Sequence, residues 1–137
     1  MEIKIYNYLP NEAMTIRSRV FVEEQGFTDY PDEVDERAMH ILLWDGDDAV
    51  ASSRLVRLED GSYLVGRIAV LRERRGGGLG RSVVSAAEAL ARENGGERIV
   101  VHAQAHARGF YSSLGYSQFG EEDTVEGCDH LWMEKQL

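Results

Sequence analysis

Residues 72–82 read RERRGGGLGRS, and this segment decides how the rest of the chain is interpreted. It lies between a predicted strand that ends at Val70 and a predicted helix that begins near Leu79. Glycines let a backbone approach a ligand closely, and the start of a helix offers unpaired N–H groups and the positive end of the helix dipole. Because Arg75 and Arg81 add charged donors suited to phosphate oxygens, the segment predicts a cradle for a pyrophosphate.

Two familiar phosphate-binding patterns do not fit this segment. A Walker loop needs a lysine directly after its second glycine, and residues 72–82 contain no lysine. The dinucleotide pattern Gly-x-Gly-x-x-Gly, if it starts at Gly76, needs a third glycine where the chain has Arg81. Neither a P-loop nor a dinucleotide-binding fold is therefore predicted.

Upstream of the cradle, the pattern predicts a strand, a helix and an antiparallel meander. Apolar residues alternate over 3–8, and Asn11 is expected to cap a helix that runs to about residue 20. The acidic stretch 29–36, which contains Pro31, is predicted to be a loop, either solvated or bordering a binding site. Turn signals then separate three predicted strands, at 39–44, 49–58 and 62–70.

Downstream of the cradle, an apolar stripe from Leu79 to Ala91 predicts a helix, which Gly95 and Gly96 end. A short buried strand follows at 98–103, and strand, helix and strand in this order predict a parallel crossover. The chain closes with a predicted helix and two predicted strands, at 107–114, 116–119 and 130–135. The fold class is therefore α+β with a central mixed sheet.

The composition predicts one globular domain over residues 1–137, because 43% of the residues are hydrophobic and 28% are charged. The net charge of −9 argues against nucleic acid as a partner, and no apolar run is long enough to span a bilayer. The single cysteine, Cys128, cannot form an internal disulfide, and no signal peptide is visible. A cytoplasmic chain without membrane contact is expected.

Two segments match motifs of one enzyme family. RGGGLG at 75–80 fits Arg/Gln-x-x-Gly-x-Gly/Ala, and QAHARGFYSSLGY at 104–116 is similar to Asn-x-x-Ala-x-x-Phe-Tyr-x-x-x-Gly-Phe, with Gln104 in place of the commoner asparagine. The chain thus resembles the GCN5-related N-acetyltransferases over essentially its whole length, in particular the small ElaA and YjcF type. This resemblance implies a three-layer α/β/α fold of about six or seven mostly antiparallel strands, about four helices and a splayed parallel strand pair.

The resemblance also implies that acetyl-CoA is the acyl donor. In the family, the pantetheine arm pairs with the strand before the cradle, and the pyrophosphate lies on the glycine loop. The cofactor-binding residues implied here are Ile68, Ala69, Val70, Arg75, Gly76, Gly77, Gly78, Leu79, Gly80, Arg81, Ser82, Gln104 and Phe110.

Acyl transfer needs a proton donor for the leaving thiolate and a proton acceptor for the attacking amine. Tyr111, in the second motif, is expected to be the general acid. Many relatives place a glutamate on the strand before the cradle, but residues 63–68 contain no carboxylate. The general base therefore stays open between Glu23, Glu24 and His40, with His130 as a further candidate.

The acceptor is expected to be a primary amine of a small molecule or a protein lysine, bound at Phe21, Glu23, Arg54, Arg67 and His130. Two interpretations stay open for the arginines, which either bind a substrate carboxylate or form internal ion pairs with Glu23 or Asp35. No metal site is predicted, because the only closely spaced histidines straddle a strand-to-helix junction. A non-catalytic CoA-binding module is the alternative function, and both a monomer and a homodimer fit the sequence.

Overall fold

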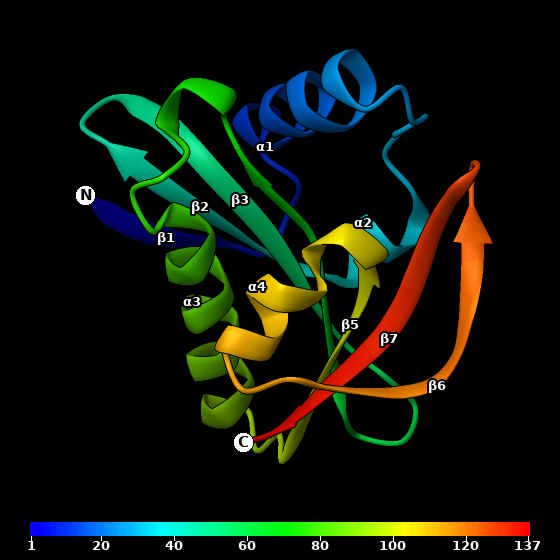
Figure 1. Cartoon of the computed structure of the whole chain (residues 1–137). Coiled ribbons are helices and arrows are strands. Elements are labelled where there is room, and N and C mark those ends of the chain that lie inside the picture. The colour runs from blue at the N-terminus through cyan, green and yellow to red at the C-terminus, as the bar shows by residue number, and fades with distance from the viewer.

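The computed structural model describes all residues from 1 to 137 and contains one seven-stranded sheet, in the order β1-β2-β3-β4-β5-β7-β6 (Figure 1). Neighbouring strands are antiparallel except β4 and β5, which are parallel. The predicted mixed sheet and its parallel crossover are therefore confirmed. The strands are β1 (Glu2–Tyr6), β2 (Met39–Asp45), β3 (Asp48–Arg57), β4 (Tyr63–Val70), β5 (Arg98–Gln104), β6 (Ser117–Val125) and β7 (Cys128–Gln136).

Four α-helices and three further helical segments, of π or 3-10 type, connect the strands. None of the helices is long and apolar enough to cross a membrane. In chain order they are α1 (Asn11–Arg17), its π-helical continuation η1 (Ser18–Glu24), α2 (Glu33–Arg37), the 3-10 turn η2 (Arg72–Arg74), α3 (Leu79–Glu93), the 3-10 turn η3 (Ala105–Ala107) and α4 (Arg108–Ser113).

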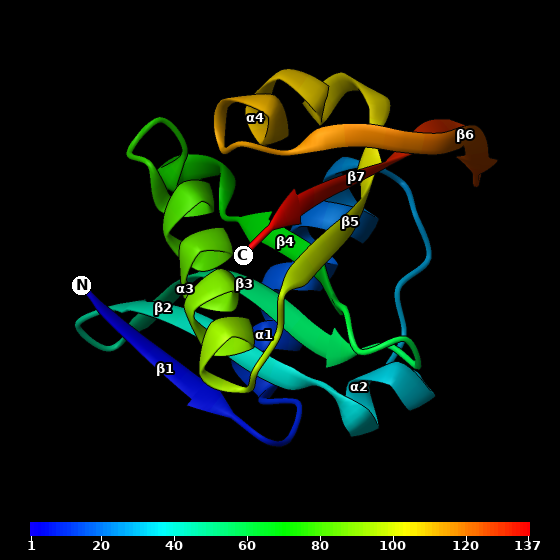
Figure 2. The ribbon, with the colours of Figure 1, turned by 90° about the horizontal axis from the view of Figure 1, so that it is seen from below.

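Helices cover both faces of the sheet, as the predicted three-layer fold requires. In β2, Ile41 and Leu43 belong to one core with α3 and α4, whereas Leu42 between them packs against α1. Successive side chains of a strand point to opposite faces, so one strand contributes to two cores. Figure 2 shows α3 and α1 on opposite sides of β2 and β3.

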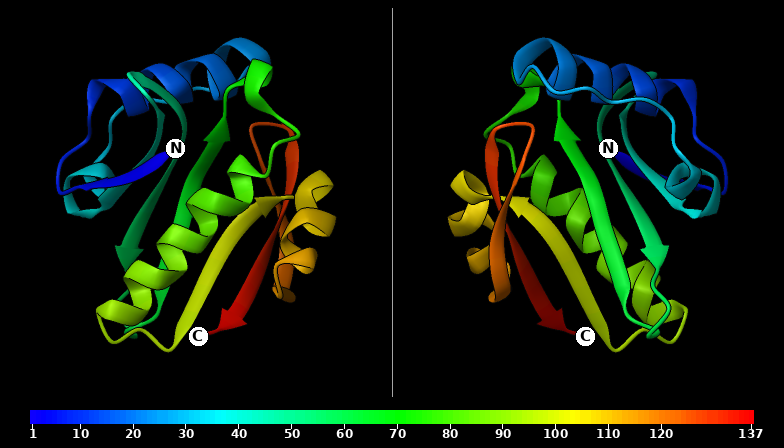
Figure 3. Two further views of the ribbon diagram at one scale, coloured as in Figure 1. Left: turned by 90° about the vertical axis from the view of Figure 1, so that its left-hand side faces the viewer. Right: turned by 90° about the vertical axis from the view of Figure 1, so that its right-hand side faces the viewer.

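The parallel strands β4 and β5 pair only near their N-terminal ends, from Tyr63 with Ile99 to Val65 with Val101. Just beyond, the register of β4 against β3 shifts at a bulge where Arg67 has a left-handed φ of 49°. A bulge bends its strand, so β4 turns away as the pairing ends. The two strands diverge toward their C-terminal ends, as Figure 3 shows, which confirms the predicted splayed pair.

Some local expectations were wrong. The stretch 29–36 is not all loop, because Asp32 and Asp35 cap each other's backbone N–H at the start of α2. At α1, Pro10 rather than Asn11 occupies the cap position, and no side chain caps the helix. The strand expected at 116–119 is longer and forms β6, because it pairs with β7 in a hairpin as far as Val125.

Candidate active site

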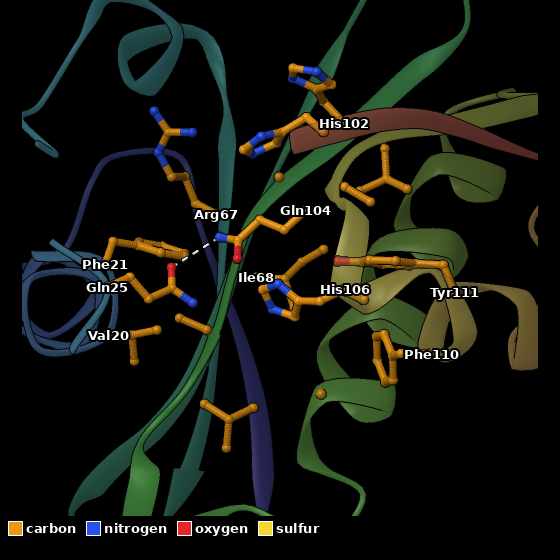
Figure 4. Close-up of a pocket in the computed structure, with 18 of the residues that line it drawn as sticks. Val20, Phe21, Gln25, Arg67, Ile68, His102, Gln104, His106, Phe110 and Tyr111 are labelled. Carbon is orange, nitrogen blue, oxygen red and sulfur yellow. Dashed lines mark hydrogen bonds between the residues drawn. The ribbon is translucent and has the colours of Figure 1, made fainter. Parts of the chain in front are cut away.

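A cavity of about 680 Å³ opens where β4 and β5 diverge. Its walls come from η1 and the loop after it, β4, the start of α3, the end of β5, and α4 (Figure 4). Gly77 and Ser82, which the sequence also implied, lie outside the lining. The implied cofactor residues that line the cavity are Ile68, Ala69, Val70, Arg75, Gly76, Gly78, Leu79, Gly80, Arg81, Gln104 and Phe110.

The glycine segment forms the N-terminal end of α3. Gly78 is the N-cap residue, with a φ of 77° that favours glycine. The first N–H to close a helical bond is that of Ser82, which donates to the Gly78 carbonyl at 3.1 Å. The N–H groups of residues 79–81 have no acceptor within the helix and are available to an anion. At Gly80, a Cβ would lie 3.3 Å from Phe110 Cζ, so glycine lets that ring close against the helix start.

Arg75 is held by a carboxylate next to this cradle. Its Nη1 and Nη2 donate to the two carboxylate oxygens of Glu24 at 2.9 and 3.0 Å, and its Nε donates to the Val70 carbonyl at 3.1 Å. Arg75 lines the cavity, whereas Glu24 does not. In this structure the Glu24 carboxylate is therefore paired with Arg75 beside the cradle.

Tyr111 lines the cavity from α4 and is 7% exposed. Burial raises the pKa of its hydroxyl well above the ordinary value for tyrosine, and no hydrogen bond within the protein contributes to the shift. The phenol is therefore protonated at neutral pH. Figure 4 shows the hydroxyl pointing into the cavity, where it is available as a donor.

The part of the cavity on the α1 face of the sheet is polar. Along β5, the residues next to His102 and Gln104 pack in the core with α3, so these two side chains point to the opposite face. The same alternation along β7 places His130 on this face, directly opposite Gln104 in the strand pairing. Gln104 Nε2 donates to Gln25 Oε1 at 2.9 Å and so bridges the cavity from β5 to the end of η1 (Figure 4).

Arg67 and Phe21 line the same part of the cavity. Arg67 Nε donates to Asp29 Oδ1 at 3.2 Å, while its side chain remains 37% exposed. The β6–β7 turn closes this part from the side, because the Glu126 carboxylate accepts bonds from the Thr28 N–H and hydroxyl, each at 3.0 Å.

Besides Gly77, Ser82 and Glu24, three further candidate site residues from the sequence lie outside the cavity. His40 is 1% exposed, its Nε2 lies 2.9 Å from the Asp35 carbonyl oxygen, and burial lowers its pKa. Arg54 Nη1 donates to Asp35 Oδ1 at 2.8 Å and to Asp32 Oδ1 at 3.1 Å, which makes the internal ion pairs that the sequence analysis left open. Glu23 is exposed beside η2. None of these three side chains reaches the cavity, so the proposed site below leaves them out.

Sequence reasoning missed the buried guanidinium of Arg17. This residue is 1% exposed, and it donates to both carboxylate oxygens of Asp29 and to Asp35 Oδ1, each at 2.8 Å. Burial alone would raise the pKa of Asp35, but the hydrogen bonds from Arg17 and Arg54 outweigh it and hold that pKa well below its usual range. The available signal was the position of Arg17, which falls on the apolar face of its helix next to Ile16.

The glycine-rich helix start and the splayed parallel strand pair are the features that the resemblance of the sequence implied. A sequence model described as "Acetyltransferase (GNAT) domain" matches residues 11–137, so the chain belongs to this acetyltransferase family. A Bacillus subtilis protein named as an acetyltransferase is 38% identical over 129 residues, which cover 90% of this chain and 87% of the relative. Other relatives include YjcF of the same organism and ElaA of Escherichia coli, as the sequence predicted.

Solved structures agree with this assignment. The crystal structure of Escherichia coli ElaA superposes with a TM-score of 0.86 at 26% identity and covers 98% of both chains. A Bacillus subtilis acetyltransferase that was solved in complex with CoA has a TM-score of 0.77 at 18% identity and covers 99% of this chain and 98% of that chain. The predicted family and fold are thereby confirmed.

Proposed function

We propose that this protein is an acetyl-CoA-dependent N-acetyltransferase that transfers the acetyl group to a primary amine by direct attack in a ternary complex. The observation that carries the proposal is one continuous cavity, which runs from the open N–H groups at the start of α3 to the polar part beside His102 and Gln104. A donor with a pyrophosphate at one end and a reactive thioester at the other fits such a cavity. The CoA complex of a protein with the same fold supports this choice of donor.

Two features of the chain fit the donor. The N–H groups of residues 79–81 and the guanidinium of Arg81 offer donors to the pyrophosphate. Pairing between β4 and β5 stops at Val65, so residues 68–70 are not paired with β5 and this edge of β4 can pair with the amides of a pantetheine arm. On this stretch the Val70 carbonyl already accepts a hydrogen bond from Arg75 Nε.

The transfer forms an N–C bond between the amine and the acetyl carbonyl carbon and breaks the C–S bond to CoA. The amine nitrogen loses two protons relative to its ammonium form, of which one ends on the sulfur as CoA thiol and one goes to solvent. Tyr111 is the proposed donor to the sulfur. A thiol has a pKa of about 8.5, below that of the buried phenol, so Tyr111 mainly stabilises the developing thiolate by a hydrogen bond.

One observation favours a second candidate function. β4 carries no carboxylate between Tyr63 and Val70, and the sequence-predicted bases Glu23, Glu24 and His40 do not line the cavity. A CoA-binding module without turnover would have the same cradle and the same splayed strands. Thiol release separates the two candidates.

The test combines binding and turnover. Calorimetric titration with acetyl-CoA is expected to give micromolar binding to the parent protein and none to Gly78→Asp, in which a carboxylate would occupy the cradle. Thiol release is then followed with phenethylamine, spermidine and a lysine-containing peptide as acceptors. Tyr111→Phe is expected to lower kcat about 10²-fold without changing the Kd for acetyl-CoA. Binding without thiol release would favour the CoA-binding module, and absence of binding would refute both functions.

A further inference from the structure

We propose that His130 is the general base of this site and that its Nε2 takes the proton from the acceptor amine. The inference rests on the proposed N-acetyltransferase function and names a catalytic residue within it. The cavity is lined by residues from both faces of the sheet. Tyr111 belongs to the core on the α3 and α4 face, whereas His130 lies on the opposite face, and both line the one cavity.

The hydrogen bond of the His130 ring decides which nitrogen is free. His130 Nδ1 lies 2.9 Å from the Cys128 carbonyl oxygen. A carbonyl oxygen only accepts, so Nδ1 carries the hydrogen and donates it. In the neutral ring the lone pair is then on Nε2, which has no hydrogen-bond partner within the protein. This is the tautomer that a base acting through Nε2 requires.

Packing fixes the orientation of the ring. His130 is 8% exposed. The edge of Phe27 packs against it at a centroid distance of 6.4 Å, and the His102 ring lies at 4.9 Å. His102 is itself stacked on Trp132 at 4.4 Å. The imidazole is therefore held in one position at the polar end of the cavity.

Several charged groups surround this imidazole. On β5, His102 Nε2 lies 2.7 Å from Asp123 Oδ1 of β6, and because a carboxylate accepts, that nitrogen is the donor. Asp123 is also the β6 residue opposite His130 in the strand pairing. Glu126, Asp29 and Arg67 also line the cavity. Asp29 is paired with Arg17 and Arg67, and on β7 itself Cys128 and Asp129 directly precede His130.

The other histidines are placed differently. His40 is buried outside the cavity. His102 donates from Nε2 to Asp123, which leaves its lone pair on Nδ1, and its ring packs against Trp132 and His130. His106 lines the cavity but is exposed, and no hydrogen bond orients it. Only His130 combines a cavity position, an anchored Nδ1 and a free Nε2.

In the proposed step, the acceptor arrives as an ammonium, and His130 Nε2 removes one proton. The neutral amine attacks the thioester carbonyl carbon, the C–S bond breaks, and the remaining excess proton of the nitrogen passes to the sulfur. The imidazolium then releases its proton to water. The products are the acetamide and CoA thiol, so atoms and charges balance.

Two substitutions at position 130 test the step. His130→Asn keeps an N–H donor near the Nδ1 position, which maintains the bond to the Cys128 carbonyl, and removes Nε2. His130→Gln places an amide near the Nε2 position, where it has no basic lone pair. Both are expected to lower kcat for the best amine of the panel at least 10²-fold, with an unchanged Kd for acetyl-CoA.

The pH profile of kcat distinguishes a base from a residue that only supports the structure, because loss of a purely structural side chain would not change the shape of the profile. A general base acts only in its unprotonated form, so the parent kcat is expected to fall as the pH is lowered. Both variants should lose this acid limb, and His40→Gln should retain it. Retention of the acid limb and of kcat in both His130 variants would overturn the base role and leave N-acetyl transfer standing. Loss of the acid limb and of kcat in His106→Gln in place of the His130 variants would also overturn the base role. A parent protein that binds acetyl-CoA without releasing thiol would overturn both the proposed function and the base role.

Discussion

If the proposed CoA pyrophosphate binds at Arg75, it has to compete with Glu24, and this competition predicts a variant that binds CoA more tightly than the parent protein. Both Nη atoms of Arg75 donate to Glu24, at 2.9 and 3.0 Å, so these donors are occupied before the ligand arrives. The side chains of Arg75 and Glu24 are 44% and 23% exposed, and an ion pair of this exposure contributes up to about 1 kcal/mol. When CoA binds, breaking the Glu24–Arg75 ion pair makes the binding free energy less favourable by that amount. Glu24→Gln is therefore expected to lower the Kd for CoA about fivefold at low salt.

Calorimetric titration of CoA checks this prediction. The gain should shrink at about 1 M salt, where the Debye length is about 3 Å. Glu24→Gln should bring no gain in an Arg75→Gln background, because no ion pair remains to be broken. Glu23→Gln removes the same charge one residue earlier and should leave the Kd unchanged, because Arg75 forms its ion pair with Glu24 and not with Glu23. An unchanged Kd in Glu24→Gln, or an equal gain in the Arg75→Gln background, refutes the competition.

Two further predictions concern stability. Gly96→Ala should lower the free energy of unfolding by about 1–3 kcal/mol in urea denaturation, because its Cβ would lie 2.7 Å from Tyr63 Cδ2 and 2.9 Å from the Ala91 carbonyl oxygen; a smaller loss would mean that the α3–β5 turn yields. Acidification should destabilise the protein in two stages, since burial lowers the pKa of His40 and hydrogen bonds hold the pKa of Asp35 low against its burial. The unfolded state binds more protons in both cases, so stability falls below about pH 6.5 through His40 and again below about pH 4 through Asp35. Urea midpoints between about pH 3 and 8 check this, and His40→Gln should lack the first stage.

The glycine cradle at the proposed cofactor end was predictable as a structure because it is built from contiguous sequence. The cradle needs only backbone N–H groups, left-handed glycines such as Gly78, and flanking arginines, and these follow one another at 75–81. Most strands were predictable for a similar reason, since local turn signals and short apolar runs mark them in the sequence. The short helix α2 was not, because its start depends on a reciprocal cap between Asp32 and Asp35, which in sequence reads as a solvated acidic loop.

The acceptor end was much less predictable because distant segments form it. His130 meets Gln104 only through the pairing of β7 with β5, and no local pattern reveals this register. The ion pair of Glu24 with Arg75 likewise joins the end of η1 to the cradle. A sequence shows which carboxylates and imidazoles are present. Which of them can act as the general base depends on which side chains line the cavity, and strand pairing determines that.

The buried ion pairs connect the fold to the acceptor end of the site. Buried pairs add little net stability compared with apolar packing, whereas removal of one partner is costly. Arg17 ties Asp29 to α1, and Asp29 follows directly after the loop that carries Gln25 and Phe27. That loop supplies the partner of Gln104 and the ring that packs on His130. The ion pairs thus fix the loop that, with β5 and β7, encloses the polar part of the cavity, and their contribution lies in the geometry of the site more than in stability.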